Sequence, residues 1–382
     1  MSISPERFCL GGLMKEIDKE YDIEEIDSKI DTLYKSSLEQ NISSNDSNFS
    51  SRFSNSLIFP YLETPNSLTL KNKENTEITF SKDNILMSFK NQTLTKQLQK
   101  SLYEMSKENI DNIIKELSGN FTKIIKNRNG NYFCSDLVKV CNAEQRIIIL
   151  KELSGTLSED CMDEFGTHPI QNLIELSSSE EEYKLIVSSF NDCNKILMAS
   201  LNLNGAFVIQ KLIVYIPEKM RIEFNNIFVK LFCILSRDMY GVCTAKKFIG
   251  YTKNELIVKQ VLNIILTNFV TLSNNQYGNY LMQYLLEKWW RTPEGVFLKK
   301  MIILKYQTLA ANHYSSYICD LFLKLCSHEE KKKILSTFNN YKVFGKNNNL
   351  KNKTLLYQNK ITKDINESKE IKNKTCSNLN EK

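Results

Sequence analysis

The chain has 382 residues, of which 42% are hydrophobic and 25% are charged, so most of it can bury a core. Its 12 Gly and 6 Pro are too few for a turn-dense all-β sandwich and favour helix. Basic residues exceed acidic ones by 50 − 44 = 6, but residues 342–382 alone carry ten Lys against four acids, 10 − 4 = 6. The first 341 residues are therefore neutral, and the basic excess describes a tail.

The cysteines and histidines favour no metal site. Ten cysteines run from Cys9 to Cys376 without a CxxC spacing, and the three histidines form no ligand-spaced cluster with them. We expect reduced thiols in a soluble, intracellular and cytoplasmic protein. No run approaches the roughly 18 apolar residues of a membrane span, and the first 20 residues lack the apolar stretch of a signal peptide.

Residues 1–83 are predicted to form a largely disordered N-terminal arm. Residues 37–55 are rich in Ser and Asn and nearly free of aliphatic side chains, so they cannot bury enough apolar surface to offset the entropy of ordering. The segment IEEIDSKIDTLY has the pattern of a short amphipathic helix. We favour its interpretation as part of a weakly structured arm over its interpretation as a docking helix.

From residue 84 onward, apolar residues cluster at spacings of three and four, which predicts an all-α chain. Six short breaks share one register, with Gly130, Gly166, Gly205, Gly241, Gly278 and, in the sixth, Ser315. Five residues after each stands a mostly polar residue, at separations of 36, 39, 36, 37 and 37 residues, and an apolar pair follows two residues later. Such a period is typical of helical-repeat solenoids.

We therefore predict a repeat domain over residues 84–382. One period before Ser135 lies Gln99, with Leu94 in the place of the glycine, and one period after Asp320 lies Gln358. The predicted repeats are 84–119, 120–155, 156–194, 195–230, 231–267, 268–304, 305–341 and a degenerate eighth at 342–382.

The segments DEFGTHPIQNLIEL, LNGAFVIQKLI, NQYGNYLMQYLLE and HYSSYICDLFLK resemble repeats of the Pumilio (PUF) family of RNA-binding proteins. The resemblance covers about residues 84–341. It implies a curved α-helical solenoid in which each repeat reads one base of single-stranded mRNA with two or three side chains. It implies no cofactor and no metal, and we expect no enzymatic activity.

Three positions of each repeat would form the RNA-binding site. The first edge position directly follows the register glycine, and the second edge position lies four residues later on the same helix face. The stacking position between them follows the first edge position and can stack on bases. In chain order the three positions are Thr95, Lys96 and Gln99; Asn131, Tyr132 and Ser135; Thr167, His168 and Gln171; Ala206, Phe207 and Gln210; Val242, Cys243 and Lys246; Asn279, Tyr280 and Gln283; Ser316, Tyr317 and Asp320; and Thr354, Leu355 and Gln358.

The resemblance also implies a code for RNA that runs antiparallel to the protein. Asn with Gln reads uracil, Cys, Ser or Thr with Gln reads adenine, and Ser with an acid reads guanine. Repeats four and five are expected to tolerate several bases, with a phosphate as an alternative partner for Lys246, and Ser135 is expected to relax the uracil preference of repeat two. The predicted element is 5′-(U)GUNNAUA-3′, bound for post-transcriptional regulation of translation or decay.

Two other functions remain open. A protein-binding solenoid of HEAT or armadillo type would use the same positions for peptide, without dependence on base identity. A divergent PUF-like protein of ribosome biogenesis would bind structured RNA with little base preference. Trp289 and Trp290 lie at an inter-helix turn, where they either pack internally, which we favour, or anchor a protein co-regulator on the outer face. We expect a monomer that binds no membrane.

Overall fold

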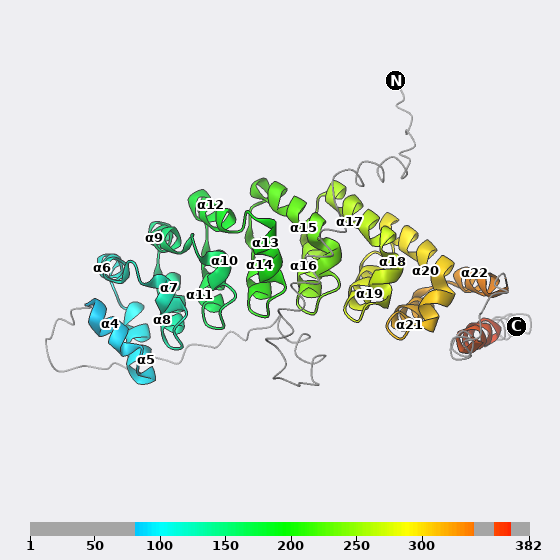
Figure 1. The fold of residues 1–382 in the computed structure, drawn as a ribbon, viewed down its shortest axis with the longest axis horizontal. Coiled ribbons are helices and arrows are strands. Elements are labelled where there is room, and N and C mark those ends of the chain that lie inside the picture. The colour runs from blue at the N-terminus through cyan, green and yellow to red at the C-terminus, as the bar shows by residue number, and fades with distance from the viewer. Residues whose placement is uncertain (1–80, 340–354, 368–382) are drawn as a thin grey trace, which may run out of the picture. The chain divides into compact units, whose positions relative to one another are not determined.

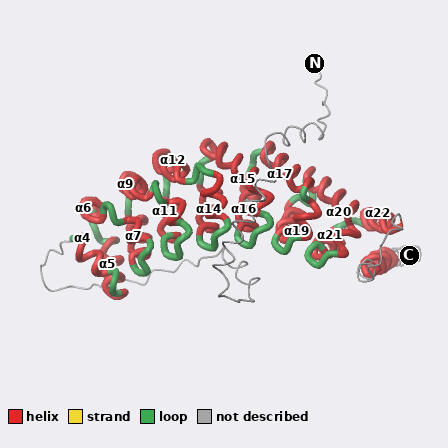
Figure 2. Tube along the Cα trace, in the orientation of Figure 1, coloured by secondary structure: helices red, strands yellow, loops and turns green. Residues whose placement is uncertain are grey.

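The computed structural model describes residues 81–339 and 355–367. The chain divides into two units, residues 1–76 and 77–382, and all described residues belong to the second. The predicted arm up to residue 80, the position Thr354 and the tail beyond residue 367 lie outside the described residues. The predicted all-α fold is confirmed, because every regular element in the described ranges is a helix (Figure 2).

Each of the first three repeats consists of a short helix, an inner helix and an outer helix. These are α4 (Lys82–Ser88), α5 (Gln92–Leu102) and α6 (Lys107–Leu117); α7 (Phe121–Ile125), α8 (Gly130–Val140) and α9 (Ala143–Leu153); and α10 (Leu157–Asp160), α11 (Thr167–Leu176) and α12 (Glu180–Ser189). The helix α4 begins two residues before the predicted start of the repeat domain.

The later repeats keep a separate inner helix, but in α15 and α20 the outer helix of one repeat is continuous with the short helix of the next. They comprise α13 (Cys193–Ser200), α14 (Gly205–Tyr215), the 3-10 helix η1 (Glu218–Met220), α15 (Arg221–Leu235), α16 (Gly241–Tyr251), α17 (Glu255–Thr267), α18 (Phe269–Asn274), α19 (Gly278–Lys288), α20 (Pro293–Ala311), α21 (Ser316–Leu325) and α22 (His328–Asn339), followed by a helix at residues 355–367. The inner helices α5, α8, α11, α14, α16, α19 and α21 contact one another in that order and form one row (Figure 1).

The repeat boundaries predicted at about 230/231 and 304/305 fall inside α15 and α20, each of which joins two repeats. Between α6 and α7, Gly119 adopts a φ of 76°, which glycine tolerates and which ends the outer helix. The α15 segment RIEFNNIFVKLFCIL contains neither Gly nor Pro. The outer helix of repeat four continues without a break into the short helix of repeat five.

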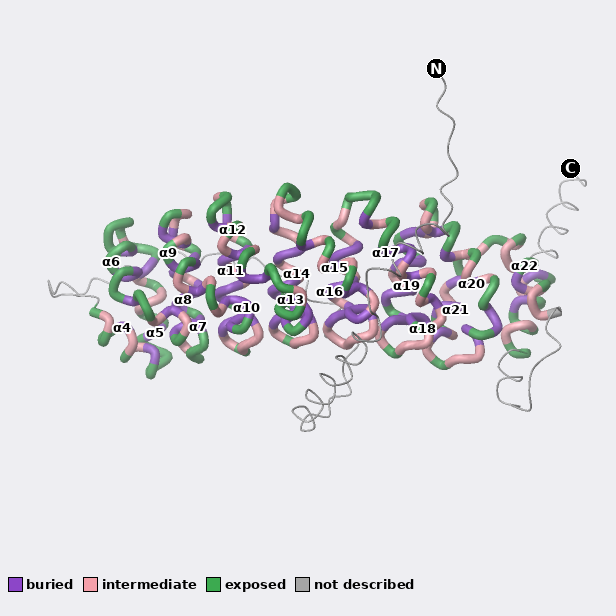
Figure 3. The backbone as a smooth tube through the Cα atoms, turned by 45° about the horizontal axis from the view of Figure 1, so that its top comes forward, coloured by how far each residue is buried: buried purple, intermediate pink, exposed green. Residues whose placement is uncertain are grey.

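The core lies between the helices of each repeat and its neighbours (Figure 3). The apolar pair of each inner helix from α8 to α21 is buried, as at Leu285 and Leu286 of α19. Aromatic rings join adjacent elements, and the Phe228 ring centroid of α15 lies 4.9 Å from that of Phe248 in α16. Because each repeat buries its apolar face only against its neighbours, the stacked row is the unit of stability.

The register glycines allow each inner helix to start close to the helix before it. A Cβ atom on Gly130, Gly166, Gly205 or Gly241 would lie 2.5–2.7 Å from the backbone oxygen of the residue six positions earlier. In repeat seven the hydroxyl of Ser315 donates a hydrogen bond of 2.7 Å to the corresponding oxygen, that of Leu309. The close approach in repeats two to seven therefore favours a small residue at this position, whereas repeat one has the exposed Leu94 there.

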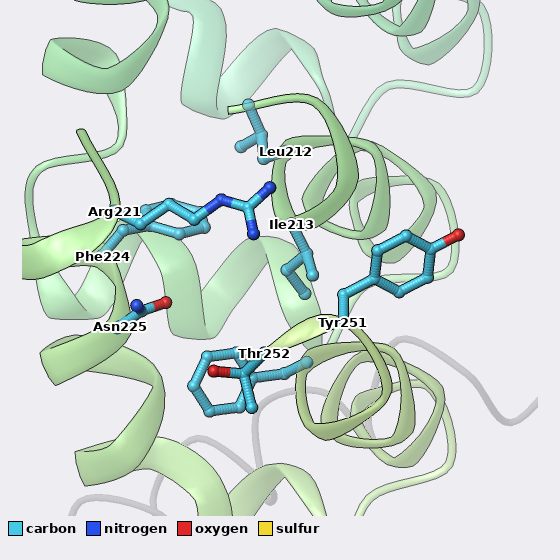
Figure 4. Close-up of a pocket in the computed structure, with 8 residues that line it drawn as sticks. Leu212, Ile213, Arg221, Phe224, Asn225, Tyr251 and Thr252 are labelled. Carbon is cyan, nitrogen blue, oxygen red and sulfur yellow. The ribbon is translucent and has the colours of Figure 1, made fainter. Parts of the chain in front are cut away.

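In α9 and α15, an arginine of the outer helix caps the inner helix of the same repeat. In repeat four, Arg221 Nε donates to the Ile216 oxygen at 2.7 Å and Arg221 Nη2 donates to the Val214 oxygen at 3.2 Å. Its guanidinium reaches toward Leu212 and Ile213 beside a cavity of about 10 Å³ (Figure 4), which is too small for a ligand. A cation at the carbonyl end of α14 also complements the helix dipole.

The tryptophan pair belongs to the packing. Trp289 is 4% exposed, while the Trp290 ring lies 5.7 Å from that of Phe322 and under Lys299 Nζ at 4.6 Å. Trp289 therefore packs internally and offers little surface to a partner, whereas Trp290 is half-buried. A protein co-regulator near this pair stays a prediction.

No single helix within residues 81–339 and 355–367 has the length and apolar composition to cross a membrane, although α13 and α14, bent by 119°, meet that test as a pair.

Candidate nucleic-acid interface

An Asn or Asp side chain caps the start of the inner helix in each of the first seven repeats. Its Oδ1 accepts hydrogen bonds of 2.7–3.3 Å from the backbone N–H groups two and three residues later. These caps are Asn91, Asn127, Asp163, Asn202, Asp238, Asn275 and Asn312. Because Asn91 occupies the same place as the others, repeat one shares the register although Leu94 replaces its glycine.

Sequence reasoning missed these caps, although an Asn or Asp stands three residues before every register glycine or its replacement. Burial raises the pKa of Asp238, while hydrogen bonds from the backbone of Gly241, Tyr240 and Met239 act in the opposite direction. The caps fix where each inner helix begins, and they thereby fix the place of the three positions that follow.

The stacking positions form a row of exposed side chains on the inner helices. Tyr132, Tyr280 and Tyr317 are 59%, 53% and 49% exposed, and Phe207 is 38% exposed. Lys96 and His168 are also exposed, whereas Cys243 is half-buried. Large aromatic side chains so exposed do not serve as core packing and can meet a ligand, and the Tyr317 ring also lies 5.7 Å from that of His313.

The two edge positions lie at different depths. The first edge side chains of repeats one to six are 1–5% exposed, and Ser316 of repeat seven is half-buried. The second edge side chains Gln99, Gln171, Gln210, Lys246, Gln283 and Asp320 are half-buried, whereas Ser135 is buried. A ligand on this surface therefore meets mainly the second edge and stacking side chains. Direct base contact by the first edge side chains stays a prediction.

In repeats six and three, the first edge side chain orients the glutamine at the second. Asn279 Nδ2 donates to the oxygens of Asn275 and Gln276, and its Oδ1 accepts from Gln283 Nε2 at 3.0 Å. In repeat three, Gln171 Nε2 donates to Thr167 Oγ1 at 3.0 Å. Each glutamine keeps its Oε1 acceptor and a second N–H donor for a ligand.

Repeat two reproduces only half of this arrangement. Asn131 Nδ2 donates to the Asn127 oxygen at 3.0 Å and to the Arg128 oxygen at 2.7 Å, as Asn279 does with its own neighbours. Its Oδ1 is buried without a hydrogen-bond partner, because Ser135 stands where repeat six has Gln283. The expected loss of specificity in this repeat thus has a structural counterpart.

Repeats four and five lack a polar first edge side chain. Ala206 and Val242 are buried and apolar, so they offer no group to orient Gln210 or Lys246. The Lys246 ammonium instead lies 5.1 Å from the centroid of the Tyr284 ring, which belongs to the next repeat.

Repeat one uses side chains that the sequence analysis did not single out. Gln99 Nε2 donates to Asp136 Oδ2 at 2.6 Å, and Tyr103 Oη donates to Asp136 Oδ1 at 3.0 Å. Burial and this carboxylate raise the pKa of Tyr103 to about 12. Thr95 Oγ1 donates to the Ser88 and Asn91 oxygens, at 2.9 Å each, so it does not orient Gln99.

A cavity of about 490 Å³ opens at this place between α5 and α8. Its lining includes Gln99, Tyr103, Tyr132 and Asp136. Asp136 could not be found from the repeat register, because its contact with repeat one depends on how two inner helices pack.

Repeat seven meets the helix at residues 355–367. Asp320 Oδ1 lies 2.8 Å from Lys360 Nζ, and the hydroxyl of Tyr357 donates to the Ser316 oxygen at 3.2 Å. In this helix Leu356 is exposed and Ile361 is buried. Leu356 stands two residues before Gln358, where repeats two to seven bury a side chain, whereas Ile361 stands three residues after Gln358, where all seven repeats bury one. The burial pattern thus matches the register predicted for Gln358 only in part, and that assignment stays a prediction.

A family model described as the Pumilio-family RNA binding repeat matches residues 120–154 and 268–289. Pumilio homolog 12 of Arabidopsis thaliana is 27% identical over 283 residues, which cover 72% of this chain and 46% of that protein. Suppressor protein MPT5 of Saccharomyces cerevisiae is 27% identical over 269 residues, which cover 66% and 29%. The chain thus spans about half the length, or less, of these curated relatives.

Solved structures share the fold. The Puf4 RNA binding domain, bound to an HO endonuclease RNA 3′ UTR recognition sequence, matches with a TM-score of 0.62 and 22% identity, covering 67% of this chain and 80% of that one. The RNA-binding domain of yeast Puf5p, bound to SMX2 RNA, matches with a TM-score of 0.58 and 21% identity, covering 67% and 76%. The common register of caps, glycines and edge residues, the helical solenoid and these matches support a Pumilio (PUF) family RNA-binding protein, and they show that the chain shares the PUF fold.

Proposed function

We propose that the row of inner helices binds single-stranded RNA and reads its bases in sequence. The observation that carries the proposal is the orientation of Gln171 and Gln283 beside exposed flat side chains. Each of these amides donates one N–H to the first edge side chain of its own repeat. Its second N–H and its Oε1 atom remain as one donor and one acceptor for a ligand. The fold shared with RNA-bound PUF domains supports the same use of this surface here.

Base chemistry matches this presentation. Uracil offers an N3–H donor beside an O4 acceptor, and adenine offers an N1 acceptor beside an N6–H donor, so one amide can pair with either base. The neighbouring first edge side chain then decides which base is preferred, Asn279 for uracil in repeat six and Thr167 for adenine in repeat three. The exposed Tyr280 and His168 supply stacking surface for the same bases.

The proposed element is 5′-(U)GUNNAUA-3′, with the first letters bound by the last repeats. Repeats four and five take the unspecified bases because their first edge positions, Ala206 and Val242, are apolar. We further propose that binding occurs on mRNA in the cytoplasm and regulates translation or decay. This proposal is supported by the similarity to Pumilio-family proteins and by the 3′ UTR sequence in the Puf4 complex.

Selection from a random RNA pool on the full chain tests the proposal. We expect enrichment of UGU followed, after two unspecified bases, by AU. Bound RNA without any enriched sequence would contradict base reading and favour a nonspecific PUF-like protein, and an absence of RNA binding would favour a protein-binding solenoid.

A double substitution tests the assignment of one repeat. Asn279→Ser with Gln283→Glu replaces the uracil-reading pair by the guanine-reading pair of the family. Selection on this variant should move the third base of the element from U toward G while the other positions stay unchanged. An unchanged third base would refute the assignment of repeat six.

A further inference from the structure

Several second edge side chains contact a side chain of the following repeat. The pairs are Gln99 with Asp136, Lys246 with Tyr284 and Asp320 with Lys360. Asp136 and Tyr284 each directly follow the second edge position of their own repeat. Gln171 and Gln283 each donate a hydrogen bond to the first edge side chain of their own repeat. The second edge side chains of repeats one, five and seven make no such bond, and each contacts a side chain of the following repeat instead.

We propose that Lys360 is a specificity-determining residue for the guanine bound by repeat seven, to whose O6 atom it donates a hydrogen bond. The inference rests on the proposed RNA binding and adds a reading group to it. Lys360 Nζ lies 2.8 Å from Asp320 Oδ1, and the two side chains are 53% and 39% exposed. The pair is therefore formed before RNA arrives and is accessible to a base.

The chemistry of this pair is complementary to the whole reading edge of guanine. Guanine presents two donors, N1–H and the N2 amine, beside one acceptor, O6. The Asp320 carboxylate only accepts and takes the two donors, while the Lys360 ammonium only donates and takes O6. Adenine and cytosine would place an amine against the ammonium and a ring acceptor against the carboxylate. Uracil would match both groups but lacks the amine.

Lys360 also compensates for two disadvantages of Asp320. An aspartate has a shorter reach than the glutamate usual at this position, so a second group that holds the base strengthens the contact. A lone carboxylate near the RNA backbone would be repelled by the phosphates, and the ammonium at 2.8 Å offsets that charge.

The helix that carries Lys360 has other attachments to the repeats. Ile361 and Ile365 are buried, Lys331 Nζ lies 3.1 Å from Asp364 Oδ2, and Tyr357 donates to the Ser316 oxygen. Lys360→Met keeps an unbranched side chain that is one heavy atom shorter and removes the charge and the donors. We therefore expect this variant to leave the helix in place.

The test measures binding of the full chain to the eight-base element with guanine, 6-thioguanine, inosine or adenine at the second base. The sulfur of 6-thioguanine is a weak acceptor in place of O6, and inosine lacks the N2 amine. For the wild type we expect 6-thioguanine and inosine each to weaken binding about tenfold. Lys360→Met should weaken binding to guanine about tenfold, lose the sensitivity to 6-thioguanine and keep the sensitivity to inosine.

Lys363→Met is the matched control, because Lys363 lies on the same helix and pairs with Glu367 at 3.7 Å. This variant removes the same charge and should keep both sensitivities. If Lys360→Met still discriminates against 6-thioguanine, or weakens all four RNAs equally as loss of a phosphate contact would, the inference is wrong. If the wild type itself shows no preference for guanine at this base, the proposed guanine reading of repeat seven fails instead.

Discussion

Repeat two contains a buried hydrogen-bond acceptor that a single substitution should satisfy. Asn131 and Asn279 make the same two hydrogen bonds to the backbone, but only Asn279 Oδ1 accepts from a glutamine, at 3.0 Å. Asn131 Oδ1 is buried without a partner. Ser135→Gln places an amide four residues after Asn131, where repeat six has Gln283. We expect the substitution to stabilise the fold and to sharpen base reading.

The expected free-energy gain is modest. A buried acceptor without a hydrogen bond costs about 1–3 kcal/mol, and ordering a glutamine side chain costs up to about 2 kcal/mol. The net increase in the free energy of unfolding should therefore be about 1 kcal/mol. At the seventh base of the element, the added amide should raise the preference for uracil about tenfold, since a well-oriented edge contact is worth about 1–3 kcal/mol.

Denaturant unfolding and RNA-binding assays measure the two effects. The reciprocal variant Gln283→Ser serves as a matched control, because it leaves Asn279 Oδ1 without its partner and should destabilise the chain and relax the third base. If Ser135→Gln gains neither stability nor uracil preference while Gln283→Ser loses both, the two repeats are not equivalent. If neither variant changes anything, the role of the first edge asparagine in orienting glutamine is refuted.

Two further predictions concern the scaffold. Gly205→Ala should lower the free energy of unfolding by about 1–3 kcal/mol, because the added Cβ would lie 2.5 Å from a backbone oxygen. Gly155→Ala is the control and should cost far less, because its Cβ would meet nothing within 4 Å. Equal costs in denaturant unfolding would refute the steric reason. Arg146→Met should cost about 3–5 kcal/mol, because Arg146 Nε donates to the buried Glu182 carboxylate at 2.7 Å. Burial alone would raise the pKa of Glu182, but hydrogen bonds from Arg146 and the backbone hold it below its ordinary value of 4.5. A carboxyl group with a lowered pKa contributes stability that is present above pH 4.5 and is lost as the pH falls through the pKa of the folded state. The difference in unfolding free energy between wild type and Arg146→Met should therefore narrow below pH 4.5. A difference that is independent of pH would contradict this reason.

The repeat architecture could be predicted because its signals are local and periodic. Gly241, Gly278 and the apolar pairs mark the start and the buried face of each inner helix at a spacing that the sequence shows directly. The missing glycine at Leu94 weakened the prediction of repeat one, yet Asn91 shows the register there. A search for Asn or Asp three residues before each glycine would have found it.

Other features depend on packing between repeats and have no period in the sequence. The contacts of Asp136 with Gln99 and of Lys360 with Asp320 join residues 37 and 40 positions apart, and only the distance between adjacent helices decides whether they meet. The continuous helix α15 was missed because a helix that joins two repeats looks like two helices when the period alone divides the chain.

The most direct test of base reading is the affinity of the full chain for the element UGUAAAUA and for single-base variants of it, at one salt concentration. Replacing the third base, which repeat six reads through Gln283, should weaken binding about tenfold or more. Replacing the fourth or fifth base, which face Val242 and Ala206, should change binding little. Equal affinities for all of these RNAs would contradict sequence-specific reading by this solenoid.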